Sequence, residues 1–394
     1  MIKMIESIYI NNFKSLIDFK LDLTRFNCLI GLNGSGKSTV LQAIDFLAQL
    51  MSGRVDEWLS ERHWNINDVK FKLEEKQNKL VNFAVTFALS DDAKLKWEGK
   101  FSQKPKRCRY EKITRTDADG AETVLLSVTN RQKKEQQYNM LGMGPSDIDF
   151  EYSGSILSQL SKRLIAEVEL LAELKEFMAE VKSLDLLSPY TLKDNSRAAG
   201  DIGLGGERFP GFLQSLSKDE YDALIKNMHD FYPQLDSYVI RSLRGGVKRI
   251  VIKETCGKKG VIDFDARHIN DGTLRMLAIL AQTLVKRSIV MFDEIENGIN
   301  PELIMRLITH LVNCNAQVII TTHSPMILNY IPMEVAKDSI KILFKRNGET
   351  RAKKFLDLPE TARKMEMLSA GEIFVDTDLT GLSARLASME ADPA

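Results

Sequence analysis

The sequence has few cysteines, no long apolar run and no excess of charge of either sign. Its four cysteines are far apart and form no C-x-x-C pair, which argues against a zinc site and a disulfide framework. No stretch reaches the roughly 18 apolar residues of a membrane-spanning helix. The N-terminus lacks the apolar core of a signal peptide. We therefore expect a protein of the reducing cytoplasm that is not embedded in a membrane.

The charge balance limits the expected partners. The chain of 394 residues carries 54 lysines and arginines and 54 aspartates and glutamates, so its net charge is +0. This composition does not suit a protein that coats nucleic acid through a basic surface. Contact with DNA would need a local basic patch. Three segments could supply such a basic patch: 104–109, 131–134 and 241–259. Solvated loops and strand ends explain their charges at least as well.

The most specific pattern is a phosphate-binding loop, G-x-x-x-x-G-K-[ST], at Gly31–Thr39. An apolar run, 26–30, predicts a buried strand before it, and 39–47 has helical spacing after it, as the motif requires. The backbone N–H groups of such a loop favour a phosphate anion. We expect Lys37 to reach the β- and γ-phosphates of ATP and Ser38 to bind Mg²⁺. The loop residues expected to bind the nucleotide are Asn33, Gly34, Ser35, Gly36, Lys37, Ser38 and Thr39.

A second motif is the apolar strand 288–292, which is followed by Asp293 and Glu294. Buried parallel strands carry functional side chains at their carboxyl ends. Asp293 is expected to hold Mg²⁺, directly or through water, and Glu294 to polarise the attacking water as a general base. An exposed acidic pair after a core strand is the simpler interpretation, but the phosphate loop favours the catalytic one.

A third motif, Asn-Asp-Gly-Thr at 270–273, opens a segment with helical spacing of apolar residues. Asn270 or Asp271 is expected to cap this helix. The N–H groups of a helix end also suit an anion. We therefore expect Asn270, Asp271 and Gly272 to face the γ-phosphate of an ATP that is bound to a second subunit.

A fourth motif is the histidine that follows the apolar strand 318–321. A lone histidine is usually structural. His323, however, follows the strand that comes after the Asp-Glu strand, where it is well placed to sense or orient the γ-phosphate.

The order of the expected elements is that of a split α/β nucleotide-binding fold. Residues 1–130 form an N-terminal lobe that contains the phosphate loop and is β-rich from residue 80 onward. Residues 131–237 form a mainly helical insert. Residues 238–394 form a C-terminal lobe, with strands up to Phe264. After them we expect a helix from Thr273, a strand over 289–292, a helix from Pro301 and a strand over 318–321.

The insert is expected to be helical over 155–187, loop-like over 190–212 and to contain two helices near 217–230. It lacks the heptads of a long coiled-coil arm. Because it departs most from a minimal ATPase, we expect the region near 150–260, or the adjoining β-rich segment, to carry a surface for a partner or a trigger.

The four motifs, in this order, resemble the ABC-type ATPase superfamily in its SMC/RecF-like branch, which implies a mixed sheet and a parallel RecA-like core. Within the branch the chain resembles the OLD (overcoming lysogenisation defect) ATPases and stand-alone AAA-type ATPases of bacterial anti-phage systems. Ile8–Ser15 is similar to the first strand of that family, which implies that Lys14 also contacts the nucleotide. Asp293–Pro301 is similar to its magnesium-and-base strand and D-loop, and 367–372 to the end of its ATPase domain.

The resemblance implies a homodimer or higher oligomer with ATP and Mg²⁺ at the interface, and a separate effector protein, a nuclease or a toxin. Asn270 stands where the family carries serine, but an amide can still donate to a phosphate. OLD nucleases continue into a Toprim domain, for which the about 70 residues after His323 are too few. The acidic residues Glu372, Asp376 and Asp378 are therefore expected to be solvated. The family's glutamine loop is not evident, and its contact is expected from 60–70 or from 80–110.

The leading hypothesis is an ATP-hydrolysing dimer that acts as a sensor or motor for a separate effector in defence against phage. The second is a DNA repair or recombination ATPase of the RecF type that binds DNA directly. The third is the ATP-binding subunit of a membrane transporter, against which the first strand, the D-loop and the long insert argue.

Overall fold

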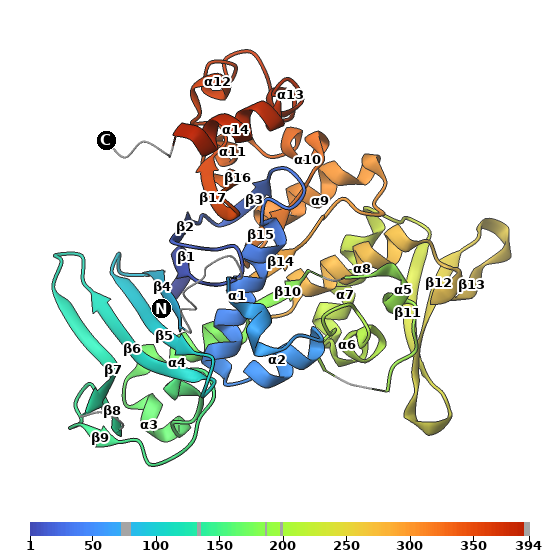
Figure 1. The fold of residues 1–394 in the computed structure, drawn as a ribbon. Coiled ribbons are helices and arrows are strands. Elements are labelled where there is room, and N and C mark those ends of the chain that lie inside the picture. The colour runs from blue at the N-terminus through green and yellow to red at the C-terminus, as the bar shows by residue number, and fades with distance from the viewer. Residues whose placement is uncertain (72–79, 132–134, 186, 198–199, 390–394) are drawn as a thin grey trace. The chain divides into compact units, whose positions relative to one another are not determined.

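The computed structural model describes residues 1–71, 80–131, 135–185, 187–197 and 200–389 (Figure 1). They form two compact units, and each unit is built from segments that are distant in the sequence. Unit 1 consists of Met1–Val181, Lys337–Arg363 and Asp376–Ala394, and unit 2 of Lys182–Ala336 and Lys364–Val375. Most of the basic segment 131–134 lies outside the described residues.

The larger sheet of unit 1 is an eight-stranded antiparallel sheet (blue to teal in Figure 1). Its order is β2-β1-β4-β5-β6-β7-β8-β9. Buried apolar residues alternate with more exposed ones along β4, so one face of the sheet forms a core and the other is open. The strands are β1 (Ile2–Asn11), β2 (Phe19–Asp22), β4 (Leu80–Leu89), β5 (Lys94–Ser102), β6 (Arg107–Thr116), β7 (Glu122–Arg131), β8 (Glu135–Met140) and β9 (Ser146–Asp147).

The phosphate loop belongs to a second part of unit 1. The fully buried β3 (Phe26–Ile30) pairs in parallel with β16 (Ile340–Arg346), which forms a hairpin with β17 (Glu349–Lys354). Helix α1 (Lys37–Ser52) follows the loop and is itself mostly buried. The loop is therefore fixed at both ends by core elements.

Short helices complete unit 1. The helix α4 packs against α1 and β1, and α14 packs against β16. These and the other helices are α2 (Val55–Glu61), η1 (Ile66–Val69), η3 (Ile156–Ser158), α3 (Lys162–Ala166), α4 (Glu169–Ala179), α12 (Pro359–Ala362) and α14 (Leu379–Met389).

Unit 2 contains three parallel strands in the order β10 (Lys182–Leu184), β14 (Ile289–Phe292) and β15 (Gln317–Thr321). Both β14 and β15 are fully buried, and α8 (Asp271–Leu284) and α9 (Pro301–Asn313) belong to the same unit. Because Phe292 pairs with Ile320, the residues that follow these two strands emerge at one edge.

A separate antiparallel sheet of unit 2 consists of β11 (Leu235–Ser242), β12 (Lys248–Thr255) and β13 (Val261–Asp265). Helix α6 packs on β11 and β12, and α7 packs on β11 and α8. The other helices are α5 (Pro189–Leu192), α6 (Phe209–Ser215), α7 (Lys218–His229), α10 (Pro325–Asn329), α11 (Met333–Ser339), which crosses into unit 1, and α13 (Ala370–Val375).

The structure confirms the mixed α/β class and most of the expected elements, including the strand 289–292 and the helix from Pro301. Three expectations were wrong. The segment expected to be helical over 155–187 includes the strand β10, the loop-like 190–212 contains α5 and the start of α6, and 217–230 holds one helix rather than two. The strand β10 is three residues long and pairs with β14, a partner distant in the sequence, so no local pattern marks it.

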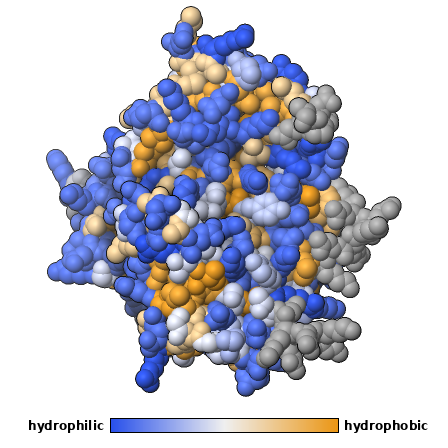
Figure 2. Space-filling view, turned by 90° about the vertical axis from the view of Figure 1, so that its left-hand side faces the viewer, coloured by the Kyte–Doolittle hydropathy of each residue, from blue (hydrophilic) through white to orange (hydrophobic). Residues whose placement is uncertain are grey.

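The molecular face in Figure 2 is mostly hydrophilic, with separate hydrophobic groups. No helix in the described part of the chain combines the length and the apolar character needed to cross a membrane.

Candidate functional site

The phosphate loop of unit 1 lies against the side chain of Thr350. Gly36 has a φ of 108°, and a Cβ built on it would lie 2.2 Å from the Thr350 Oγ1 atom. Any side chain at this position would therefore be strained and would clash. The glycine that the motif requires here is explained by this contact as well as by its dihedral angles.

Thr350, on β17, ties the loop to two other segments. Its buried hydroxyl donates to the carbonyl oxygen of Ser35 (3.0 Å), shares a hydrogen bond with Ser15 (2.8 Å) and accepts one from Lys345 Nζ (3.0 Å). Burial lowers the pKa of Lys345. Sequence analysis missed both residues, since they follow the loop by more than 300 positions and match no local motif.

The start of α1 is suited to an anion. Its N-cap residue, Gly36, makes no side-chain cap, and the first turn contains no acidic residue. Lys37, only 6% exposed, donates to the carbonyl oxygens of Gly31 (3.0 Å) and Leu32 (3.2 Å). The buried Ser35 hydroxyl has no hydrogen-bond partner within the described part of the chain. Backbone donors at a helix start, together with a buried cation and an unused hydroxyl, fit phosphate oxygens.

The other loop residues expected from the sequence lie at the tip or in the first helical turn. Asn33 and Gly34 are exposed at the tip, and Ser38 and Thr39 are half-buried at the start of α1. The loop is thus accessible to a ligand on the side of its tip.

Lys14 lies beside α1. Its Nζ atom donates to Gln42 Oε1 (2.9 Å) and lies 3.3 Å from the centre of the Trp64 ring. Gln42 is one helical turn after Ser38, so the two side chains share a face of α1. Lys14 therefore lies on the face of α1 that carries the expected Mg²⁺ ligand. The roles of Gln42 and Trp64 were not evident from the sequence.

In unit 2, Asp293 and Glu294 form a tight turn after β14. The Thr321 hydroxyl donates to the Asp293 carboxylate and accepts a hydrogen bond from the Glu294 N–H (2.8 Å). Glu294 has a φ of 46°, is exposed, and accepts a hydrogen bond from Asn297 Nδ2. A non-glycine residue at positive φ costs on the order of 1 kcal/mol, so these contacts hold it in a conformation it would otherwise avoid.

Arg275, on α8, binds the backbone of the same turn. It is 5% exposed, and its guanidinium donates to the carbonyl oxygens of Asp293 (3.1 Å), Glu294 (2.9 Å) and Leu187 (3.1 Å). Burial lowers the pKa of Arg275, while the nearby carboxylates of Glu296, Glu294 and Asp293 oppose that shift. Sequence analysis missed Arg275, although a single arginine among the apolar residues of that helix was a usable signal.

His323 follows β15 at the same edge as Asp293 and Glu294. Its backbone N–H donates to Glu296 Oε1 (2.8 Å), and the second oxygen of Glu296 is buried without a hydrogen-bond partner. The structure thus brings together the expected Asp293, Glu294 and His323, and adds Glu296 to them.

Asn270 caps α8, and it is one of the two residues that the sequence predicted for this role. Its Oδ1 atom accepts a hydrogen bond from the Thr273 N–H (2.7 Å), while Asp271 pairs with Lys193 (2.6 Å). A Cβ on Gly272 would lie 2.4 Å from the carbonyl oxygen of Gly298, so the helix start touches the D-loop backbone. A cavity of about 670 Å³ adjoins them and is lined by Phe231, Tyr232, Asn270, Asp271, Gly272, Thr273, Gly298, Ile299, Asn300 and Leu303.

The expected metal ligands are oxygen atoms, the type that Mg²⁺ prefers: the Ser38 hydroxyl in unit 1 and the Asp293 carboxylate in unit 2. Within the described ranges, no group of three or more His, Cys, Asp or Glu residues could hold a metal ion. Mg²⁺ typically takes one or two carboxylates and completes its shell with water and phosphate oxygens. Each of these two groups, taken by itself, is therefore a suitable ligand for an ion that arrives with a nucleotide.

The acidic residues near the C-terminus are exposed, as expected. Glu372 accepts a hydrogen bond from the Ser369 N–H (2.8 Å), and Asp378 accepts one from the Thr380 N–H (3.0 Å). They serve as local caps.

Two family models match overlapping parts of the chain. Residues 4–186 match the family described as "AAA ATPase domain", and residues 155–329 match "AAA domain, putative AbiEii toxin, Type IV TA system". The chain has no match among curated proteins.

Several solved structures are similar to the chain at low identity. The SMC head domain from Thermotoga maritima is 11% identical, with 89% of this chain and 98% of that chain covered and a TM-score of 0.44. An SmcHead bound to the C-winged helix domain of ScpA is 15% identical, with 92% and 99% covered and a TM-score of 0.47. An Smc head domain with an extended coiled coil, bound to the C-terminal domain of ScpA derived from Pyrococcus furiosus, is 14% identical, with 92% and 98% covered and a TM-score of 0.44. From the two family matches, residues 4–329 are similar to ATPase domains of the AAA type, as the phosphate loop predicts.

Proposed function

We propose that the protein hydrolyses ATP and acts as a homodimeric sensor or motor for a separate effector in bacterial anti-phage defence. The observation that carries the ATPase proposal is the turn after β14. There, Arg275 and Thr321 hold Asp293 and Glu294 in fixed positions, in a chain that also has a complete phosphate loop. A strained, well-supported acidic turn suits catalysis better than it suits a solvated surface pair.

Each residue of the two sites has a role in this proposal. Lys37 and the first N–H groups of α1 bind the β- and γ-phosphates, and Ser38 and Asp293 are the protein ligands of Mg²⁺. The metal, when bound, neutralises negative charge on the phosphate oxygens. Glu294 takes a proton from the attacking water through its carboxylate, which Asn297 orients, and His323 orients the γ-phosphate.

The proposed assembly has two-fold symmetry. The start of α8, at Asn270–Gly272, faces the phosphate loop of a second copy, so that two ATP molecules are buried between the chains. Such an interface is self-complementary. ATP should tighten it, because a ligand bound across an interface stabilises the associated form.

The defence role rests on the family descriptions and on the resemblance to OLD and anti-phage ATPases. One matched family has the description "AAA domain, putative AbiEii toxin, Type IV TA system", which is compatible with an ATPase that works with a partner gene product. In the described residues no metal-binding cluster of the nuclease kind occurs. The effector, a nuclease or a toxin, is therefore proposed to be a separate chain, and the complex to act in the cytoplasm.

Phosphate release and light scattering test the ATPase and the dimer together. Glu294→Gln keeps the size of the side chain but removes the base, so hydrolysis should fall by about 10²- to 10⁴-fold while ATP binding persists. This variant should form a dimer with ATP and not without it. Glu302→Gln, at an exposed position in α9, is the matched control and should behave as the wild type. Unchanged hydrolysis in Glu294→Gln removes the base assignment, and a monomer under both conditions removes the shared site.

Purification of the protein from its native operon tests the effector. A co-eluting nuclease or toxin supports the proposal. A protein that elutes alone and degrades nucleic acid by itself contradicts it.

A DNA-binding ATPase of the RecF type remains the second candidate, because one hairpin is strongly basic. Ser237–Ile250, on β11 and β12, contains four basic residues and no acidic one. Arg241 and Arg249 are direct cross-strand partners, a like-charge pairing that costs stability and is relieved by Asp263 and Asp265 on β13. The fully exposed turn carries Arg244.

The segment 104–109 is a weaker candidate for DNA. Lys106 pairs with Asp56, and Arg107 lies over the Tyr152 ring at 5.2 Å, so both charges have internal partners. Duplex DNA binding by the wild type and by Arg244→Glu/Lys248→Glu tests the hairpin. A loss of affinity and a shallower salt dependence in the variant favour the second candidate.

A further inference from the structure

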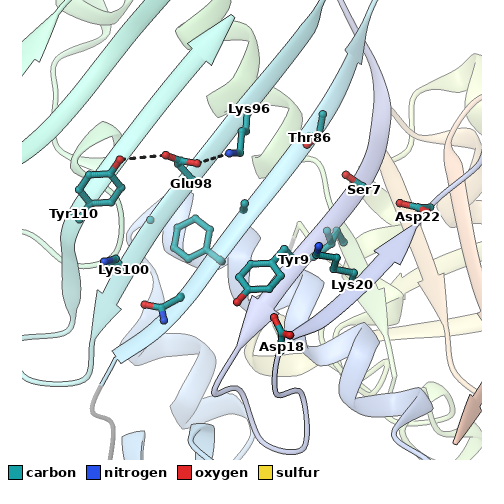
Figure 3. Close-up of a pocket in the computed structure, with 15 residues that line it drawn as sticks. Ser7, Tyr9, Asp18, Lys20, Asp22, Thr86, Lys96, Glu98, Lys100 and Tyr110 are labelled. Atoms are coloured by element: carbon teal, nitrogen blue, oxygen red, sulfur yellow. Dashed lines mark hydrogen bonds and ion pairs between the residues drawn. The ribbon is translucent and has the colours of Figure 1, made fainter. Parts of the chain in front are cut away.

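The open face of the eight-stranded sheet holds the larger of the two cavities described, about 970 Å³ in volume (Figure 3). Its walls come from β1, β2, β4, β5 and β6, all in unit 1. The cavity exists because small side chains (Ser7, Ala84 and Thr86) lie between larger ones on neighbouring strands. It shares no residue with the phosphate loop or with the Asp293–Glu294 turn.

Two tyrosine–lysine pairs flank this cavity. Tyr9 on β1 is the direct cross-strand partner of Lys20 on β2, and Lys100 on β5 is the direct partner of Tyr110 on β6. The Lys100 Nζ atom lies 5.8 Å from the centre of the Tyr110 ring. The same combination of an aromatic ring and a cation therefore occurs on both sides of the cavity, as Figure 3 shows.

The two rings are too far apart for one planar ligand. β1 and β6 are separated by three strand spacings of about 4.8 Å, and Tyr110 lies two residues along β6 from the position in line with Tyr9, so the tyrosines are roughly 16 Å from each other. A single base cannot stack on both. Two bases joined by a flexible backbone can do so.

An unused acceptor lies between the pairs. Asn82 on β4 is the cross-strand partner of Lys100, and its buried Oδ1 atom has no hydrogen-bond partner among the residues that the structure describes. A buried acceptor without a donor is costly, so a ligand that brings an N–H group relieves this cost. The exocyclic amino and ring N–H groups of nucleobases are donors of this kind.

One carboxylate of the cavity, Glu98, already has an ion-pair partner. Glu98 pairs with Lys96 (2.6 Å) and accepts a hydrogen bond from Tyr110 (3.1 Å). Burial and the adjacent Asp18 raise the pKa of Tyr9, and Asp22 lies within electrostatic reach of Lys354. Among the described residues no ion pair engages Lys20 or Lys100, so both side chains can meet an anion in the cavity.

We propose that this sheet face binds single-stranded nucleic acid of two or more nucleotides. One base stacks on Tyr9 and another on Tyr110, Lys20 and Lys100 contact the phosphates, and Asn82 accepts a hydrogen bond from a base. Aromatic rings on an open sheet face with basic neighbours are a recurring way of holding unpaired strands. In a duplex the bases are stacked on one another and cannot reach the tyrosines.

Fluorescence anisotropy with labelled eight-nucleotide RNA and DNA single strands tests the proposal on the full chain. Base–aromatic stacking is worth enough for Tyr9→Leu or Tyr110→Leu to weaken binding by roughly 5- to 150-fold each. Tyr9→Phe and Tyr110→Phe keep the rings and should keep the affinity. The double variant Lys20→Gln/Lys100→Gln should reduce the slope of log K against log salt by about 1.4. Lys218→Gln, at an exposed position on α7, is the matched control.

The comparison of the RNA and DNA strands shows which sugar the site prefers. A mononucleotide that competes as well as the oligonucleotide overturns the two-ring arrangement, and unchanged single-strand binding in both Tyr→Leu variants overturns the site itself. Melting temperature and ATP hydrolysis, measured on the same preparations, separate this proposal from the proposed function. A cavity variant that loses oligonucleotide binding but still hydrolyses ATP supports the cavity proposal and leaves the proposed ATPase function intact. A variant that loses hydrolysis but still binds the oligonucleotide bears only on the ATPase.

Discussion

The phosphate loop and the Asp293–Glu294 turn both prepare a polar site, but they are supported in different ways. The loop obtains its shape from a contiguous motif, and its glycines allow the close contact with Thr350. The turn obtains its shape from Arg275 and Thr321, which lie 18 and 28 positions away from Asp293. A contiguous motif can be recognised from a short stretch of sequence. At the turn only Asp293 and Glu294 can be recognised in this way, because the residues that hold them are distant in the sequence.

The largest expected effect concerns the loop. Lys37→Ala removes the buried cation of the loop, and hydrogen bonds to charged groups are worth about 1.5–3 kcal/mol, so the affinity for ATP should fall by roughly 10- to 150-fold. Isothermal titration calorimetry measures it. Lys14→Ala is the informative comparison, because Lys14 is held by Gln42 and Trp64 and should matter less. Equal losses in both variants would mean that the two lysines contribute equally to nucleotide binding.

The next effect concerns the turn. Arg275→Met removes the donor of one buried hydrogen bond, to the Leu187 carbonyl oxygen, and of two part-buried ones, to the carbonyl oxygens of Asp293 and Glu294. An unsatisfied group costs about 1–3 kcal/mol when it is buried and less where water can replace the donor, so the free energy of unfolding should fall by about 3 kcal/mol. Hydrolysis should fall more than ATP affinity, since the carboxylates move while the loop is unaffected. Arg306→Met removes an exposed arginine of unit 2 as a control. If ATP affinity falls and the turnover rate does not, Arg275 does not act through the turn.

The same difference explains what could be predicted from the sequence. Strand–loop–helix context and helical spacing predicted β3, α1 and α9, because each is encoded by adjacent residues. The carboxyl end of β14 was expected to be catalytic, but its supports were not, since Arg275 and Thr321 reach it only through tertiary packing.

The contacts of side chains outside the motifs could not be predicted from the sequence either. Lys14 was expected at the nucleotide from resemblance alone, and no pattern indicated its contact with Trp64. The cavity on the sheet face depends on the pairing of strands that are distant in the sequence. The sequence predicted a β-rich segment from residue 80 onward, but the register that sets each tyrosine beside a lysine appears only in the folded sheet.

A smaller effect is expected from the support of the loop. Thr350→Val keeps the shape of the side chain but removes the hydroxyl that contacts Ser15, Ser35 and Lys345, which should lower the free energy of unfolding by about 1–2 kcal/mol and weaken ATP binding several-fold. Urea denaturation and calorimetry measure the two quantities. Thr361→Val is the matched control, since Thr361 is equally buried and its hydroxyl also donates to backbone carbonyls in unit 1. It should lose similar stability without a change in ATP affinity, and a similar loss of ATP affinity in both variants would remove the special role of Thr350.

The smallest effect is a dependence of the free energy of unfolding on pH. It is caused by a lysine on β16, the strand that pairs with β3 in front of the phosphate loop. Lys341 on β16 is 3% exposed and pairs with Leu29 on β3, and burial, aided by the charge of Lys354, lowers its pKa to about 8. In the unfolded chain its pKa is near 10.5, the ordinary value of a lysine, so the unfolded state binds more protons between these two values. Stability should therefore rise with pH in that window. From pH 7 to pH 9 the wild type should gain about 1 kcal/mol relative to Lys341→Met, which cannot titrate at this position. Urea denaturation of both proteins at the two pH values measures this gain, and equal changes in the two would show that Lys341 keeps its ordinary pKa in the folded protein.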